Sequence, residues 1–61
     1  MIFVPGVFFN YDGVECVVLE VEYKPAINWV WFIQSDGSGI EVGKDMEDMH
    51  RLFREGFITK V

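Results

Sequence analysis

Alternating apolar and polar residues divide the first half of the chain into short strands. A first strand over residues 7–11 leads into Asp12-Gly13, a dipeptide typical of a hairpin turn whose central positions need positive φ. A second strand runs over residues 14–23, and its apolar positions are even at the start and odd toward the end. This change of parity predicts a sharply bent barrel strand whose halves face different parts of the core. The alternative is that Val18 simply lies exposed.

The next segments read as a second hairpin. Residues 24–28 form a connection, because Pro25 cannot continue a central strand. Residues 29–34 are predicted as the third strand, residues 36–39 as a turn, and residues 40–42 as a brief fourth strand.

The apolar period then becomes helical, over residues 46–55. Four apolar residues fall on one helical stripe, which is typical of a face packed on the core: Met46, Met49, Leu52 and Phe53. Asp45 is the expected N-cap, with Asp48 in a capping-box-like position and Glu47 spaced to pair with Arg51. Gly56 is expected to end the helix, and residues 57–61 to form a last strand.

These elements predict a mainly β fold with one short helix, in the order β-β-β-β-α-β. That order is typical of a small SH3-like barrel, with residues 1–61 forming a single domain. Barrel closure would also protect the edges of such apolar strands. The alternative fold is an open sheet of four or five strands with the helix on one face.

The first 25 residues also resemble a known family. Pro5-Gly6, the segment from Phe9 to Gly13, Val18-Leu19-Glu20 and Lys24-Pro25 are similar in order and spacing to the N-terminal KOW/SH3-like domain of elongation factor P. The resemblance implies the same barrel. It does not extend to the modified lysine that works in the ribosome, because residues 26–28 supply neither the flanking glycines nor the second lysine of that loop.

Composition limits the classes of function. Half of the residues are hydrophobic (51%) and 16% are aromatic, which excludes disorder, and the net charge is −5. Nucleic acid and anionic membranes are therefore not expected as partners, since both attract Lys and Arg and repel a protein of negative net charge. A lone cysteine, Cys16, allows no internal disulfide, and neither a signal peptide nor a membrane span is recognisable. We therefore expect a soluble protein in a reducing compartment, most simply the cytoplasm.

Catalytic chemistry finds no support in the residue pattern. His50 has no identifiable nucleophile as a partner, and Cys16 lies in a valine-rich strand where a buried, inert thiol is expected. The carboxylates are scattered, with no calcium-loop or phosphate-loop spacing. The prediction is a protein that is not an enzyme, with no catalytic residues, metal or cofactor.

Two features do predict a binding surface. The third strand is apolar on both faces, with Trp29, Trp31 and Ile33 on one and Val30 and Phe32 on the other. With Phe3, Phe8 and Phe57, this is more aromatic surface than so small a core readily hides. Carboxylates are expected on the solvent sides of the neighbouring strands. The predicted partner-binding residues are Trp29, Trp31, Ile33, Tyr23, Glu20, Glu22 and Glu41. The alternatives are that the helix or the N-terminal residues cover the second face, and that the carboxylates only keep the protein soluble.

The sequence thus favours a small acidic, non-catalytic protein-binding domain, with tryptophan anchors or a homodimer contact. One special case is a viral (phage) or mobile-element inhibitor that docks on a host nucleic-acid enzyme. The alternative function is a KOW-like RNA- or ribosome-associated module, whose aromatic residues would stack on bases. If the methionine-containing helix stripe were exposed, the helix would be the binding element instead.

Overall fold

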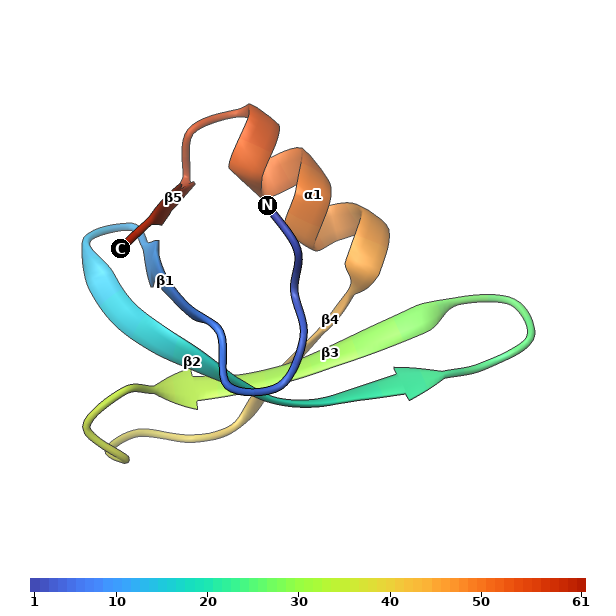
Figure 1. Ribbon diagram of the computed structural model, residues 1–61, viewed down its shortest axis with the longest axis horizontal. Coiled ribbons are helices and arrows are strands. Elements are labelled where there is room, and N and C mark those ends of the chain that lie inside the picture. Colours follow the sequence, from blue (N-terminus) through green and yellow to red (C-terminus); the bar gives the residue numbers. More distant parts are fainter.

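The computed structural model describes residues 1–61 as five strands and one helix (Figure 1). In chain order they are β1 (Phe8–Tyr11), β2 (Val14–Tyr23), β3 (Asn28–Gln34), β4 (Val42–Asp45), α1 (Met46–Arg54) and β5 (Ile58–Lys60). The fold is therefore mainly β, in the β-β-β-β-α-β order that the residue pattern predicts. Its one helix is neither long nor apolar enough to cross a membrane.

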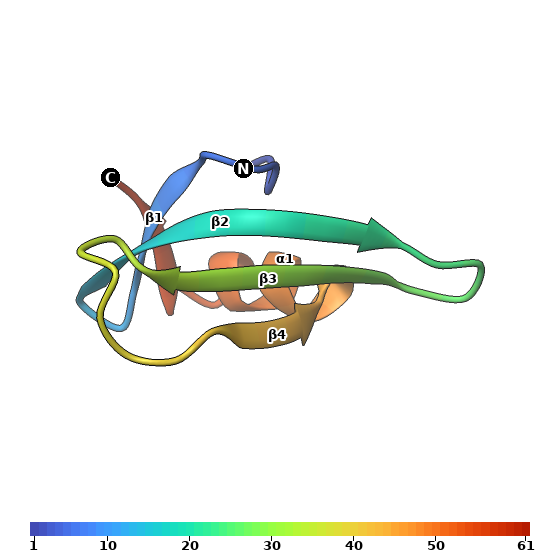
Figure 2. The same ribbon diagram turned by 90° about the horizontal axis from the view of Figure 1, so that it is seen from below.

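All five strands belong to one antiparallel sheet in the order β4-β3-β2-β1-β5. The sheet coils so that β1 and β5 turn away from the β2–β3–β4 part, and α1 lies between the two edge strands (Figures 1 and 2). The helix contacts β3, β4 and β5, so it bridges the seam that β4 and β5 do not close by pairing. This is the architecture of a small SH3-like barrel. We call the sheet face toward α1 the inner face and the opposite one the outer face.

A β-bulge in β2 explains the change of apolar parity along that strand. Val18 pairs with Phe32, but the next pair joins Glu20 to Trp31, so Leu19 is an extra residue without a partner. Val18 is 1% exposed and lies on the inner face, whereas Glu20 lies on the outer face with Trp31. The change of parity therefore comes from a bulge that keeps the apolar residues of both halves on the inner face, and the alternative of an exposed Val18 is wrong.

Aromatic rings and the helix stripe fill the inner side of the coiled sheet. Phe9 lies at the centre, with its ring centroid 5.7 Å from that of Phe3 and 5.2 Å from that of Phe32, both edge-on. Met49 of α1 and Ile58 of β5 are fully buried in the same cluster. The helix stripe is therefore core, as expected, and the helix is not the exposed apolar element.

The fourth strand lies later in the chain than the alternation at residues 40–42 indicates. It begins at Val42, and Ile40 is 81% exposed in the preceding loop. Val42, Gly43 and Lys44 pair with Phe32, Trp31 and Val30, respectively. The register is set by packing: Val42 joins Phe32 on the inner face, and Gly43 lies where the tryptophans leave no room for a side chain.

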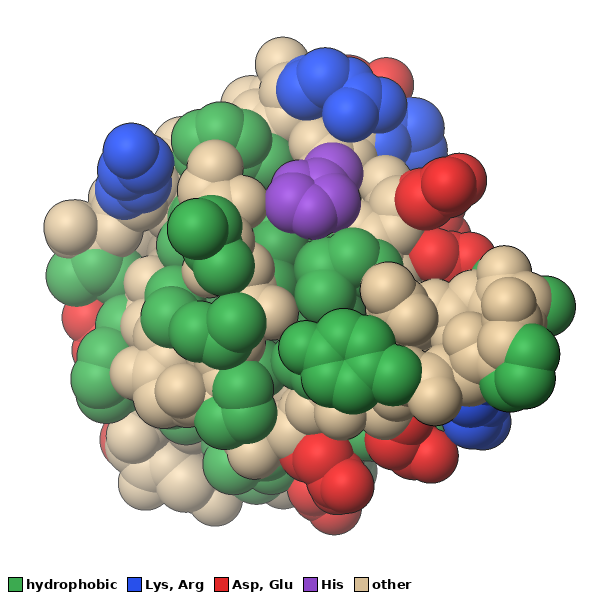
Figure 3. All heavy atoms as spheres, turned by 45° about the vertical axis from the view of Figure 1, so that its right-hand side comes forward, with side chains coloured by type: hydrophobic (Ala, Val, Ile, Leu, Met, Phe, Trp, Pro, Cys, Tyr) green, Lys and Arg blue, Asp and Glu red, His purple; other side chains and the backbone are tan.

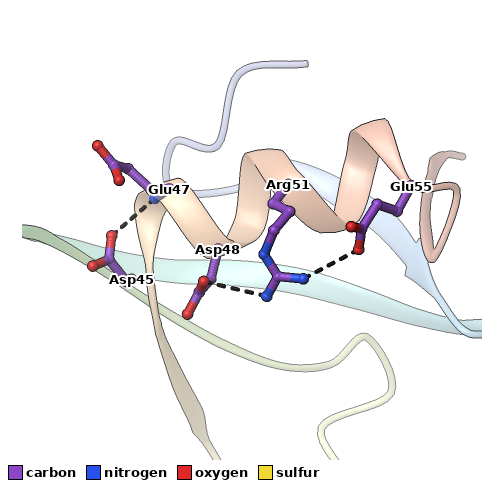
Figure 4. A network of polar contacts seen from close by, with 5 residues as sticks. All are labelled: Asp45, Glu47, Asp48, Arg51 and Glu55. Atoms are coloured by element: carbon purple, nitrogen blue, oxygen red, sulfur yellow. Dashed lines mark hydrogen bonds and ion pairs between the residues drawn. The ribbon is translucent and has the colours of Figure 1, made fainter.

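Helix α1 begins where the sequence predicts and ends one residue earlier, at Arg54, and its ion pairs differ from those expected. Asp45 caps it by accepting a hydrogen bond from the Glu47 backbone N–H at 2.9 Å. Arg51 pairs with Asp48 at 3.3 Å and Glu55 at 3.1 Å, and not with Glu47 (Figure 4). The expectation of a Glu47–Arg51 pair is wrong because Arg51 lies between two other carboxylates that its guanidinium reaches together. Asp48 therefore binds Arg51 and completes no capping box.

Candidate protein-interaction surface

The outer face of the β2–β3–β4 sheet carries both tryptophans. Because strand side chains alternate, Val30 (0% exposed) and Phe32 enter the core, while Trp29 and Trp31 lie half-buried on the opposite side. No element covers this side, since α1 lies behind the sheet (Figure 2). The N-terminal segment inserts Phe3 into the core instead. Neither the helix nor the N-terminal residues therefore cover the second face of β3. We call this surface the tryptophan face, and it comprises Trp29, Trp31, Ile33, Glu20 and Glu22.

The two indoles pack against Gly43 of β4. It faces Trp31 across the β3–β4 pair, and its backbone does not adopt a positive φ. A Cβ at this position would lie 2.8 Å from Trp31 Cζ3 and closer still to Trp29 Nε1. Atoms of both rings therefore lie close against the glycine of β4, and its lack of a side chain allows this approach.

The two indoles have a fixed mutual geometry. Their ring centroids are 6.3 Å apart at an interplanar angle of 63°. The Trp31 indole N–H donates a hydrogen bond to Glu22 Oε1 on β2. The other oxygen of that carboxylate is 3.9 Å from Lys24 Nζ in a loose, exposed ion pair. Trp31 is thus held from β2 by Glu22 and supported from β4 by Gly43, so its ring is oriented before any partner arrives.

The apolar surface continues beyond the tryptophans. Ile33 faces Val17 across the β2–β3 pair, and Val17 in turn faces Phe8 of β1, which is 49% exposed. These residues form an apolar row across three strands on the outer face. The two-residue turn at Asp12-Gly13 places Phe8 opposite Val17, although in the sequence Phe8 counts only as surplus aromatic surface.

Two of the predicted partner-binding residues lie elsewhere. Tyr23 pairs with Asn28 at the end of the hairpin, with the parity of the inner face, and is 72% exposed beyond the reach of α1. Glu41 belongs to the loop before β4, and not to a fourth strand as expected. The structure therefore brings together Trp29, Trp31, Ile33, Glu20 and Glu22, and it separates them from Tyr23 and Glu41.

Gly43 belongs to the structure of the tryptophan face but is not among the residues that the sequence pattern indicates. A glycine inside a strand often marks a site where another group approaches the backbone closely. That signal is present between Val42 and Lys44, but a strand over residues 40–42 ends before Gly43, whereas the observed β4 includes it.

Apart from the tryptophan face, an apolar groove lies on the inner side of the sheet, at the open end of the barrel. It has a volume of about 690 Å³ and lies between the β1–β2 hairpin, β3 and the loop before β4. Its apolar walls include Tyr11, Val14, Phe32, Ile40 and Val42. This groove is shallow and open, and the Cys16 thiol in its lining donates a hydrogen bond to the Val14 carbonyl oxygen at 3.6 Å.

The groups with potential chemistry do not converge on any site. His50 packs its ring against Phe3, with centroids 5.3 Å apart, and Figure 3 shows it at the border of an apolar area with Lys and Arg side chains above. Burial, together with the neighbouring Glu15 carboxylate, raises the pKa of the Cys16 thiol, which disfavours the reactive thiolate. No three His, Cys, Asp or Glu side chains are grouped closely enough to hold a metal ion.

Comparison with known proteins adds no identification. No protein-family model, curated protein or solved structure matches this chain.

Proposed function

We propose that this chain is a small acidic, non-catalytic domain that binds another protein through the tryptophan face. The observation that carries the proposal is that two indoles lie side by side on a sheet face that no element of the fold covers. Tryptophan is the residue type most enriched among binding hot spots, because it supplies a large contact area at a small entropy cost.

Preorganisation of the face supports the same function. An anchor that is already in its bound orientation loses little conformational freedom on binding, which strengthens association. Trp31 is held in this way by Glu22 and Gly43. A side chain exposed by chance would not need both supports.

The charge balance narrows the class of partner. With a net charge of −5, the domain is attracted to basic surfaces and repelled by acidic ones. A basic groove on a nucleic-acid enzyme is one such surface, and a viral or mobile-element inhibitor of that enzyme is the special case that we propose. The single, unpaired Cys16 fits the reducing cytoplasm where such a partner would lie.

The proposal is tested by affinity capture from host lysate with the intact chain, in parallel with a Trp29→Ala/Trp31→Ala variant. A matched control is Tyr23→Ala/Phe57→Ala, which removes two exposed aromatic side chains outside the tryptophan face. Circular dichroism and one-dimensional NMR establish that each variant is folded. We expect the tryptophan variant to lose captured proteins that the control retains. Identical capture by both variants would refute the proposal.

A second candidate function is the KOW-like RNA-binding module. It is favoured by the exposed indoles, since aromatic rings on an open sheet are platforms on which bases stack. Against it, Glu20 and Glu22 lie beside the rings, where they would repel phosphates. Salt-sensitive binding of single-stranded RNA in a gel shift would support this function, and an absence of binding at low salt would eliminate it.

A further inference from the structure

Acidic and basic side chains are unequally distributed around the tryptophan face. Glu20 and Glu22 of β2 lie directly opposite Trp31 and Trp29 in the strand register. Of the five Lys and Arg residues, only Lys24 approaches this group, through its loose pair with Glu22. The other four lie on the inner-face register, on the helix or on the far edge strand: Lys44, Arg51, Arg54 and Lys60.

Glu20 is the carboxylate available to a ligand. Glu22 already accepts the Trp31 indole N–H and lies near Lys24, whereas Glu20 is exposed and makes no hydrogen bond or ion pair within the chain. It lies across from Trp31 on the same face, so a group resting on that indole would have this carboxylate beside it.

Aromatic faces beside a carboxylate form a site for a cation. The face of an indole ring carries negative electrostatic potential and attracts a positive group placed over it, and tryptophan does so more strongly than tyrosine or phenylalanine. A guanidinium suits this geometry better than an ammonium, because it is planar, stacks on rings and presents a fork of N–H donors to a carboxylate.

The same charges disfavour a second copy of the chain on this face. Two tryptophan faces in contact would bring two pairs of carboxylates together, on molecules that each carry a net charge of −5. Like charges opposed across an interface are costly, so complementarity requires a cationic occupant.

We propose that the tryptophan face binds an arginine-containing basic segment of a partner protein, with the guanidinium stacked on Trp31 and paired with Glu20. Trp29 widens the platform. This inference rests on the proposed function and adds the chemistry of the partner to it.

The two tryptophans provide the readout. They are the only tryptophans in the chain and both belong to this face, so intrinsic emission reports its occupancy directly. The full chain is titrated with capped Gly/Ser peptides that contain three Arg, three Lys or three Glu residues. We expect saturable quenching by the Arg peptide, binding several-fold weaker for the Lys peptide, and none for the Glu peptide. Binding of the Arg peptide should weaken with added salt.

A matched pair of charge variants separates local pairing from net charge. We expect Glu20→Gln to lower the affinity for the Arg peptide by about two- to fivefold, which corresponds to the free energies measured for exposed ion pairs. Glu41→Gln removes the same charge from the loop before β4 and should leave the affinity unchanged. Equal losses in both variants, or equal binding of the Arg and Lys peptides, would overturn the arginine assignment.

Failure of this inference is distinguishable from failure of the proposed function. If lysate capture depends on the tryptophans but the Arg peptide does not bind, the tryptophan face still binds a protein, and the proposal of an arginine-containing partner segment is wrong. Sedimentation that shows a dimer abolished by Trp31→Ala would replace the cationic partner by a second copy. Quenching by oligouridylate but not by the Arg peptide would overturn both proposals in favour of RNA.

Discussion

Substitution of Gly43 by alanine tests how the tryptophan face is built. In an ordinary strand, alanine is more stable than glycine by about 0.5–1 kcal/mol, because glycine loses more backbone freedom on folding. Gly43 has no positive φ that would strain an alanine. Backbone considerations alone therefore predict that Gly43→Ala stabilises the protein.

The positions of the indoles predict the opposite sign. The new Cβ would lie 2.8 Å from Trp31 Cζ3 and closer to Trp29 Nε1, whereas ordinary contact begins at 3.4 Å. Both rings must lift off β4, and overpacking of this kind costs about 1–3 kcal/mol. A domain of this size has about 3–9 kcal/mol of stability in total, so the variant still folds. Each kcal/mol lost lowers the Tm by about 4–8 °C.

Thermal unfolding followed by circular dichroism measures the change, and tryptophan emission measures the displacement of the rings. We expect a lower Tm and emission shifted to longer wavelength. In a Trp29→Ala background the same substitution should cost less, because only the Trp31 contact remains, and a double-mutant cycle quantifies the coupling. A raised Tm with unchanged emission, or an equal cost in both backgrounds, would refute this account of the face.

Three further predictions concern the core, the helix cap and the thiol. Met49→Ala should destabilise the protein by about 2–5 kcal/mol in urea unfolding, because Met49 is fully buried; a cost below about 1 kcal/mol would contradict its place in the core. Asp45→Ala should cost about 0.5–2 kcal/mol through loss of the cap, with Asp45→Asn as the control that retains it. Burial raises the pKa of Cys16, so the unfolded thiol ionises first. Stability should then be fully present below about pH 9 and fall as the pH rises further. Iodoacetamide should label Cys16 much faster in denaturant than in buffer, and equal rates would refute its burial.

Strand and helix boundaries followed from the sequence wherever local chemistry decided them. Asp12 and Gly13 both have positive φ, as the hairpin dipeptide requires, and Gly56 ends the helix with φ 86°. Asp45 caps the helix through its side chain. Each of these features depends on a few adjacent residues, so a single sequence contains the necessary information.

Features that depend on contacts between distant residues were not predictable in the same way. The place of β4 is decided by the fit of Gly43 under Trp31 and Trp29, about a dozen residues away. Placing Tyr23 on the other side of the sheet required the bulge at Leu19 to be located to the residue. The members of the tryptophan face on β2 and β3 could therefore be predicted, but the role of Gly43 beneath the indoles and the separation of Tyr23 from this face could not.

The bulge at Leu19 also decides which side chains of β2 face the interior. Because Leu19 has no partner on β3, a regular ladder that instead paired Leu19 with Trp31 would turn the downstream half of the strand over. Glu20 and Glu22 would then face the apolar interior and Val21 the solvent. One unpaired residue thus keeps two carboxylates out of the hydrophobic interior, and β2 can lose that residue without turning over, because Val18 and Glu20 already pair with adjacent residues of β3.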